Sequence, residues 1–286
     1  DRLSARGFTM GYIGSVLMLI FNLLLLIKHD WFGLPSPKES VLPFQIGFLT
    51  VGIWWLAWSF WPLIKLPGKL AAKSKSSIWS GYHEIRKVFA EVRTMKSVKI
   101  FLGAFFVYTM GVQTVIYVAA LFGKDVLLLK SEEMLTTILL IQLIGIAGAY
   151  FFAFLADRIG NKAAIFVSLI IWTIACSLAF KLEPRHPEQF FALACLIGTV
   201  MGGIQSLSRA TYAKLIPGDR DNTSYFSFFE VTEKLGIVLG TFAWAAIDNI
   251  TGDMRNSILS LMVFFFIGMG ILYFLPTDKL QPSKKK

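Results

Sequence analysis

Residues 100–123 read IFLGAFFVYTMGVQTVIYVAALFG, a run of 24 amino acids without one charged side chain. Crossing a bilayer core of about 30 Å takes about 20 residues of α-helix, because each residue rises about 1.5 Å. Backbone amides and carbonyls in lipid need partners within the same segment, which a helix supplies. This run therefore predicts a transmembrane helix.

Six further uncharged runs of 18 to 25 residues are spaced along the 286-residue chain: 7–27, 40–64, 134–156, 163–180, 189–208 and 256–277. Only 16% of the residues are charged, whereas a soluble domain usually carries about 25%. A single run would fit a buried helix of a large soluble protein. Seven such runs cannot all be buried in this way, because the rest of the chain has too few polar residues to form a water-facing surface around them. Strands of a membrane barrel would alternate with period two, and these runs do not. The sequence predicts an all-α polytopic membrane protein.

An eighth candidate span, 222–247, is unusual because it contains charges. Its central part, SFFEVTEKLGIVLG, carries Glu230, Glu233 and Lys234. If the span enters from the cytoplasm near its first residues, Lys234 lies about 15 Å into the membrane, where a charge costs at least about 2.5–3.5 kcal/mol. Such charges persist when they face an aqueous cavity or one another.

Two interpretations of these charges remain open. Glu230 and Lys234 are four residues apart on a helix and can form an internal ion pair without a role in transport. Alternatively, Lys234 binds an anionic group of a substrate, and Glu230 or Glu233 carries a proton or acts as a gate.

The net charge of +10 follows the expected membrane topology. With eight spans and a cytoplasmic amino terminus, the inside segments hold 20 Lys and Arg residues and the outside segments hold seven. Lys and Arg accumulate on the cytoplasmic side of membrane proteins. We therefore expect a multi-pass protein of a bacterial cytoplasmic membrane, with both ends of the chain cytoplasmic. The basic charge is explained by topology, and no nucleic-acid partner is predicted.

The longest polar stretch, 65–99, is also the most basic. It begins with a linker-like PGKLAAKSKSS and continues with apolar residues at helical spacing, which are Ile78, Tyr82, Ile85, Phe89 and Val92. This pattern favours an amphipathic helix on the inner membrane surface. A helix that binds a protein partner is the alternative.

Enzyme motifs are not found. Cys176 and Cys195 lie in apolar runs and are expected to behave as small buried hydrophobic residues. The histidines, His29, His83 and His186, fall outside the runs, and no cluster has metal-ligand spacing. The sequence contains no nucleophile elbow and no phosphate-binding glycine loop. We predict no catalytic residue, no metal and no cofactor, and therefore not an enzyme.

A six-helix block after a long basic loop resembles the second half of a major facilitator superfamily transporter. Between two predicted spans, AFLADRIGNK (153–162) resembles the Gly-x-x-x-Asp-Arg-x-Gly-x-Lys loop of that superfamily, with alanine in place of the first glycine. In the superfamily this loop latches helices on the cytoplasmic side. The resemblance therefore gives that role to Asp157 and Arg158, with Gly160 at the tight turn and Lys162 closing the motif.

Three further stretches are similar to the vacuole-effluxer-like, or unknown-major-facilitator, family: DRLSARGFTMGYIGS (1–15), YTMGVQTVIYVAALFG (108–123) and GGIQSLSRATYAKLIP (202–217). Its fungal members are autophagy-related vacuolar amino-acid effluxers. The resemblance implies secondary transport of a small solute, such as export of an amino acid. Because the sequence has no ATP-binding motif, we expect the driving force to be an ion gradient, with a proton or another ion as the coupling ion, or the gradient of the solute itself. Met110 stands where members of the family often carry an acidic residue, so no proton-carrying role is assigned to that position.

The same resemblance implies a domain organisation of about eight transmembrane helices. Residues 1–64 would hold the last two helices of the first six-helix half, and 65–99 the cytoplasmic loop. Residues 100–276 would form the whole second half, and 277–286 a basic cytoplasmic tail. Four helices would then precede residue 1, so the chain is expected to be a fragment.

Polar residues inside the predicted spans complete the candidate site. Gln113 and Tyr117 are candidates for substrate contact, and Gln205 and Arg209, at the inner end of a span, for a cytoplasmic gate. Helix-to-helix hydrogen bonding is the alternative role for the amides, and snorkelling of Arg209 to the inner membrane surface is the alternative to a gating bond with a carboxylate. A non-transporting receptor or structural protein, and less so a membrane-embedded enzyme, remain rival functions. The expected partners are a small solute, a coupling ion and the lipid bilayer.

Overall fold

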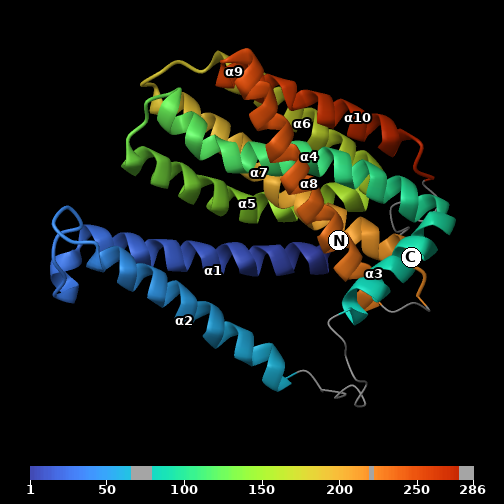
Figure 1. Cartoon of the computed structure of the whole chain (residues 1–286), viewed down its shortest axis with the longest axis horizontal. Coiled ribbons are helices and arrows are strands. Elements are labelled where there is room, and N and C mark those ends of the chain that lie inside the picture. Colours follow the sequence, from blue (N-terminus) through green and yellow to red (C-terminus); the bar gives the residue numbers. More distant parts are fainter. Residues whose placement is uncertain (66–78, 219–221, 277–286) are drawn as a thin grey trace. The chain divides into compact units, whose positions relative to one another are not determined.

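The computed structural model describes residues 1–65, 79–218 and 222–276, and these ranges are largely helical and contain no β-strand (Figure 1). The helices are α1 (Arg2–Ile27), the short 3-10 helix η1 (His29–Phe32), α2 (Leu42–Lys65), α3 (Ser80–Thr94), α4 (Lys96–Asp125), α5 (Ser131–Ile159), α6 (Asn161–Lys181), α7 (Pro187–Leu215), α8 (Asn222–Thr251), α9 (Met254–Ser260) and α10 (Met262–Tyr273). The all-α fold class predicted from the sequence is confirmed.

Seven spans in the described ranges are long and apolar enough to cross a membrane. Six lie in α1, α2, α4, α5, α6 and α7, and α9 and α10 together form the seventh, Met254–Tyr273. Each predicted uncharged run falls largely within one of them, so the chain is a multi-pass membrane protein. The predicted eighth span is a continuous helix of 30 residues, α8, which is about 45 Å long. Because α8 carries charged residues, it is not among the seven spans of the described ranges that are apolar enough to cross a membrane. That α8 crosses the membrane stays a prediction.

The chain divides into two compact units. One unit, Ile13–Gly81, contains most of α1 together with η1 and α2. Within it, the side chain of Asn22 on α1 lies against Gly47 on α2, where a larger residue would clash with the amide. The other unit joins Asp1–Tyr12 to the part of the chain that begins at Tyr82, and it contains every residue of the site described below.

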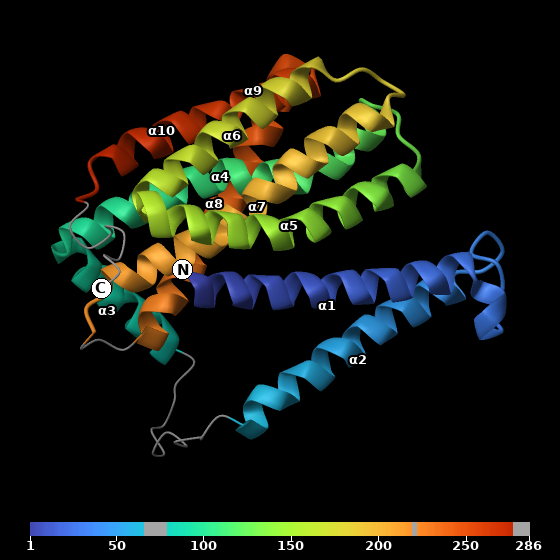
Figure 2. The ribbon, with the colours of Figure 1, turned by 180° about the vertical axis from the view of Figure 1, so that it is seen from behind.

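In the larger unit, α4, α5, α6, α7 and α10 run side by side as a bundle (Figures 1 and 2), and α8 crosses this bundle obliquely along α4 (Figure 1). Helix α5 packs along α7, and α4 contacts both α8 and α10. The interior is filled by large side chains that are almost fully buried: Tyr108, Phe152, Trp172, Tyr212 and Phe265. Many apolar side chains elsewhere on the helices remain exposed, as expected where a bundle faces lipid.

Glycines allow α5 and α7 to cross closely. A Cβ added at Gly148 on α5 would meet the backbone of Thr199 on α7. One added at Gly202 on α7 would meet the carbonyl of Gly145 on α5. Small residues at such crossings let helix backbones approach in membrane bundles. These glycines thus make α5 and α7 one closely packed helix pair.

Helix α3 packs against the bundle through one side. Val88 and Val92 are buried there, and Tyr225 of α8 donates a hydrogen bond from its hydroxyl to Glu91 at 2.7 Å. Tyr82 and Phe89, from the predicted apolar face, are 58% and 50% exposed. Placement of this face on a membrane surface stays a prediction. Ile78, the PGKLAAKSKSS linker and the tail 277–286 lie outside the described residues.

Arg255 on α9 caps the end of α6, and its loss is expected to destabilise the bundle. Its guanidinium donates to the carbonyls of Phe180 and Leu182 at 2.7 and 2.6 Å. The last carbonyls of a helix have no partner within the helix. Arg255→Met should therefore cost about 1–3 kcal/mol and lower the unfolding temperature of the purified protein in detergent. The exposed Lys38→Met is the matched control, and an equal response of both variants would refute the capping role.

Candidate functional site

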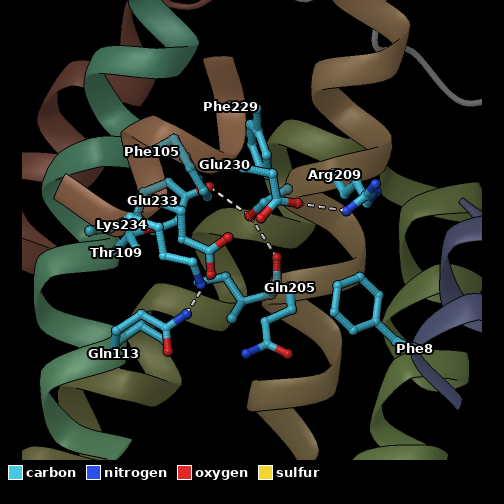
Figure 3. A pocket seen from close by; sticks show the side chains of 14 residues that line it. Phe8, Phe105, Thr109, Gln113, Gln205, Arg209, Phe229, Glu230, Glu233 and Lys234 are labelled. Atoms are coloured by element: carbon cyan, nitrogen blue, oxygen red, sulfur yellow. Dashed lines mark hydrogen bonds and ion pairs between the residues drawn. The ribbon is translucent and has the colours of Figure 1, made fainter. Parts of the chain in front are cut away.

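A polar pocket of about 230 Å³ lies inside the larger unit (Figure 3). Four helices line it: α1 with Phe8; α4 with Phe105, Tyr108, Thr109, Val112 and Gln113; α7 with Ile204, Gln205, Ser208 and Arg209; and α8 with Phe229, Glu230, Glu233 and Lys234. The volume lies somewhat below the usual range of about 300–1,000 Å³ for ligand pockets, so it fits a small solute.

The three charges of α8 all face this pocket. Glu230 forms an ion pair with Arg209, whose Nη1 donates to Oε1 at 2.9 Å. The structure thus pairs Glu230 with α7 rather than with Lys234, because the guanidinium reaches α8 across the pocket (Figure 3). Among the residues that the structure describes, no ion pair joins Lys234 to a carboxylate.

Glu233 has a different partner from Glu230. Its Oε1 accepts a hydrogen bond from Nε2 of Gln113 at 2.6 Å, so its nearest partner is a neutral amide from α4. Figure 3 shows Gln113 and Arg209 approaching the two carboxylates from opposite sides. Two carboxylates and two cations line the pocket, so its formal charges balance.

Aromatic residues build one wall of the pocket. The rings of Phe105 and Phe229 stack with centroids 4.1 Å apart, and Tyr212 stacks on Phe229 at 5.0 Å. Beside them, the hydroxyls of Tyr108 and Ser208 are hydrogen-bonded at 2.7 Å. Sequence reasoning missed these residues, because aromatic residues are common throughout the spans. The polar hydroxyl groups of Tyr108 and Ser208, which lie within apolar spans, were the one feature of the sequence that could have marked these residues as part of a site.

The other predicted site residues of the spans divide between the pocket and the surface. Gln205 lines the pocket and accepts a hydrogen bond from the hydroxyl of Tyr12 at 3.2 Å, which ties α1 to α7. Tyr117, in contrast, is 60% exposed and is not among the lining residues. The lining of the pocket on α4 ends at Gln113, and Tyr117 lies one turn further along the helix, beyond that end.

The AFLADRIGNK loop lies apart from the pocket and joins helix ends. Asp157 accepts from Nε of Arg2 at 3.2 Å, and the guanidinium of Arg158 lies 4.4 Å from the ring centre of Phe154. Gly160 has φ 84°, a conformation that side chains disfavour. Lys162 donates to the carbonyls of Tyr273 and Leu275 at 2.6 and 2.8 Å, at the end of α10.

A second polar cluster adjoins this loop and was not found from the sequence. Asn161, which is 1% exposed, donates to Asp1 at 2.7 Å and to Thr211 at 3.1 Å. Its own carbonyl oxygen accepts from Lys214 at 2.8 Å, and Lys214 also pairs with Asp1 at 2.7 Å. One amide at the start of α6 thus bonds polar groups at the start of α1 and near the end of α7.

Replacing Asn161 with leucine is expected to lower stability, because Lys214, Asp1 and Thr211 would each lose a buried hydrogen-bond partner. An unsatisfied buried group costs about 1–3 kcal/mol. The unfolding temperature in detergent should fall clearly below that of Asn249→Leu, whose exposed amide contacts only its own helix at Ala245. Equal unfolding temperatures for the two variants would contradict a stabilising role for the cluster.

Metal-binding groups are not assembled in the described part of the chain. No group of three or more His, Cys, Asp or Glu residues lies close enough to hold an ion there. Cys176 and Cys195 are both free thiols, Cys176 buried and Cys195 partly exposed.

Together, the apolar spans and the charged pocket define a polytopic α-helical membrane protein with a charged pocket among its helices. The family model described as "Vacuole effluxer Atg22 like" matches residues 1–285. The chain belongs to this Atg22-like vacuole effluxer family.

Curated relatives agree with this assignment. The chain is 28% identical over 277 residues to the "Uncharacterized MFS-type transporter YxiO" of Bacillus subtilis, covering 96% of this chain and 63% of that protein. It is 23% identical over 312 residues to "Autophagy-related protein 22-1" of Penicillium rubens, covering 97% and 49%. With "Autophagy-related protein 22" of Saccharomyces cerevisiae it shares 25% identity over 307 residues, covering 94% and 56%. The chain thus spans about half to two thirds of the length of these relatives.

Proposed function

We propose that this chain is part of a secondary transporter that moves a small solute across a membrane by alternating access. The main observation in support of this proposal is the pocket itself. Two carboxylates and two cations lie together there, among helices whose other residues are largely apolar. Charges in such surroundings are costly and usually mark a substrate or ion pathway. The name of the Bacillus subtilis relative, an MFS-type transporter, supports the same class.

The pocket favours a small zwitterion, such as an amino acid, as the solute. Lys234 would bind the carboxylate of the solute, because it has no ion-pair partner among the described side chains. Glu233, whose partner is a neutral amide, would bind the ammonium group. The aromatic wall of Phe105 and Phe229 would contact the apolar part. Export is the proposed direction, which rests on the family resemblance alone.

The predicted domain organisation is part of the proposal. Residues 1–64 would supply the last two helices of one six-helix half and 100–276 the whole of the other, with 65–99 between them in the cytoplasm. Asp157 and Arg158 would then latch helix ends on the cytoplasmic side, and Arg209 would gate the pocket through Glu230. The distribution of Lys and Arg supports cytoplasmic ends in a bacterial cytoplasmic membrane.

The rival functions have weaker support. A non-transporting receptor would not need charges inside the bundle, and a membrane-embedded enzyme would need clustered catalytic groups near one interface. The transporter named among the relatives also favours transport over catalysis. With no phosphate-binding loop in the sequence, we propose an ion gradient, or the gradient of the solute, as the driving force.

Counterflow in proteoliposomes tests the proposed function. The natural full-length protein would be reconstituted with a high internal concentration of unlabelled L-amino acids and supplied with trace radiolabelled amino acids outside. Transient accumulation of label above equilibrium, absent from empty liposomes, is the expected result. Saturable binding of the label without accumulation would overturn the proposal in favour of a receptor. Chemical conversion of the label would point to an enzyme.

A further inference from the structure

The two carboxylates of the pocket differ in the partners that hold them. Glu230 and Glu233 are three residues apart on α8, so they lie on neighbouring positions of one helix face. Glu230 is paired with the guanidinium of Arg209. Glu233 is hydrogen-bonded to the neutral amide of Gln113, and no ion pair in the described ranges holds it to a cation.

An amide partner suits a group that gains and loses a proton. When Glu233 is ionised, Nε2 of Gln113 donates to it, as the structure shows at 2.6 Å. When Glu233 is protonated, rotation of the amide by half a turn brings its oxygen forward to accept from the carboxyl O–H. The hydrogen bond is therefore kept in both states, whereas a Lys or Arg partner would favour only the ionised carboxylate.

The remaining charged and titratable groups of the pocket define the electrostatic setting of Glu233. Its own helix presents Glu230 and Lys234, and α7 presents Arg209, which Glu230 already engages. From α4 come the Gln113 amide and the hydroxyl of Tyr108, which is bonded to Ser208, and α1 presents the ring of Phe8. Lys234 is thus the only unpaired cation among the described lining residues.

From this geometry we infer that Glu233 binds the coupling proton of the transport cycle and that Gln113 is its positioning partner. One proton from the solution on one side adds to the carboxylate of Glu233 and forms the neutral acid. After the pocket opens to the other side, the same proton leaves to water there, and the carboxylate is restored. The inference rests on the proposed function, since it names the coupling ion of that site.

Infrared difference spectroscopy tests proton binding without a known solute. The purified full-length protein would be compared between neutral and acid pH, and the carbonyl stretch of a protonated carboxylic acid would be followed. We expect Glu233→Gln to lose one titrating band that Glu230→Gln and the exposed Glu39→Gln retain. Gln113→Leu should shift the frequency of the same band, because the acid loses its hydrogen bond. Persistence of the band in Glu233→Gln, or its loss in Glu230→Gln instead, would overturn the assignment.

Transport in proteoliposomes tests the coupling. With radiolabelled L-amino acids, a gradient of one pH unit should support about tenfold accumulation by the wild type, in one of the two gradient directions. Glu233→Gln should lose this accumulation, while Glu233→Asp should recover part of it. Each variant must elute as folded protein before it is scored.

The failures of the two proposals are distinguishable. A wild type without counterflow would refute the proposed function, and the coupling with it. A wild type with counterflow but no response to a pH gradient in either direction would refute only the proton inference. So would gradient-driven accumulation that survives in Glu233→Gln.

Discussion

Replacing Lys234 with methionine is expected to reduce kcat/KM for transport by about 10- to 150-fold. This range corresponds to the about 1.5–3 kcal/mol of a hydrogen bond to a charged group. Lys234 lines the pocket, and no described carboxylate forms an ion pair with it, so it is the cation that can meet the carboxylate of a solute. Its removal also leaves two carboxylates facing one guanidinium, and the resulting negative charge repels an anionic group. Initial rates in proteoliposomes measure the effect.

The matched control is Lys181→Met, which makes the same change at an exposed position outside the pocket lining. It should transport at nearly the wild-type rate. Lys234→Arg keeps the charge but changes its shape and should fall between the two. If Lys234→Met and Lys181→Met transport equally well, Lys234 does not bind the solute.

Replacing Gly202 with alanine is expected to prevent stable packing of the larger unit. An added Cβ would meet the carbonyl of Gly145 and lie 3.2 Å from the backbone nitrogen of Ala149, and backbone atoms cannot rotate away. Overpacking of this kind costs about 1–3 kcal/mol or more, although alanine favours the helix itself by about 0.5–1 kcal/mol. The yield of monodisperse protein in size-exclusion chromatography and its unfolding temperature should both fall sharply.

Gly103→Ala separates packing from helix propensity. The nearest atom to a Cβ at Gly103 is Cγ2 of Ile271, at 4.0 Å, which is an ordinary contact. This variant should be as stable as the wild type or slightly more so. A loss at Gly103 as large as that at Gly202 would mean that the effect does not come from the α5–α7 crossing.

The site was predictable from the sequence where it breaks the hydrophobic pattern. Glu230, Glu233 and Lys234 are conspicuous in an apolar helix, and the structure places all three at the pocket. Their partners were not predictable in the same way. Spacing along α8 favoured a pair between Glu230 and Lys234, but Arg209 competes from another helix, and its planar guanidinium makes the stronger bond to a carboxylate.

Residues without a distinctive signal could be placed only by the fold. Gln113 and Tyr117 are one turn apart on α4 and were both candidates, yet only Gln113 lines the pocket and bonds to α8. Their positions along α4 decide this, because the pocket lining on that helix ends at Gln113, and where it ends follows from how α4 packs against α8 and α10. Phe105 and Phe229 are two of 26 phenylalanines, and nothing local distinguishes them from those that face lipid.

The amino-acid sequence alone determined the all-α class, the apolar spans and the charged helix, because lipid imposes these requirements on each segment separately: about 20 apolar residues and a backbone bonded to itself. The tertiary structure decided which side chains meet. The Gln113–Glu233 and Arg209–Glu230 bonds and the close α5–α7 crossing join residues far apart in the chain. Such pairings depend on how helices rotate and pack against one another, and the hydrophobic pattern of a single helix does not contain that information.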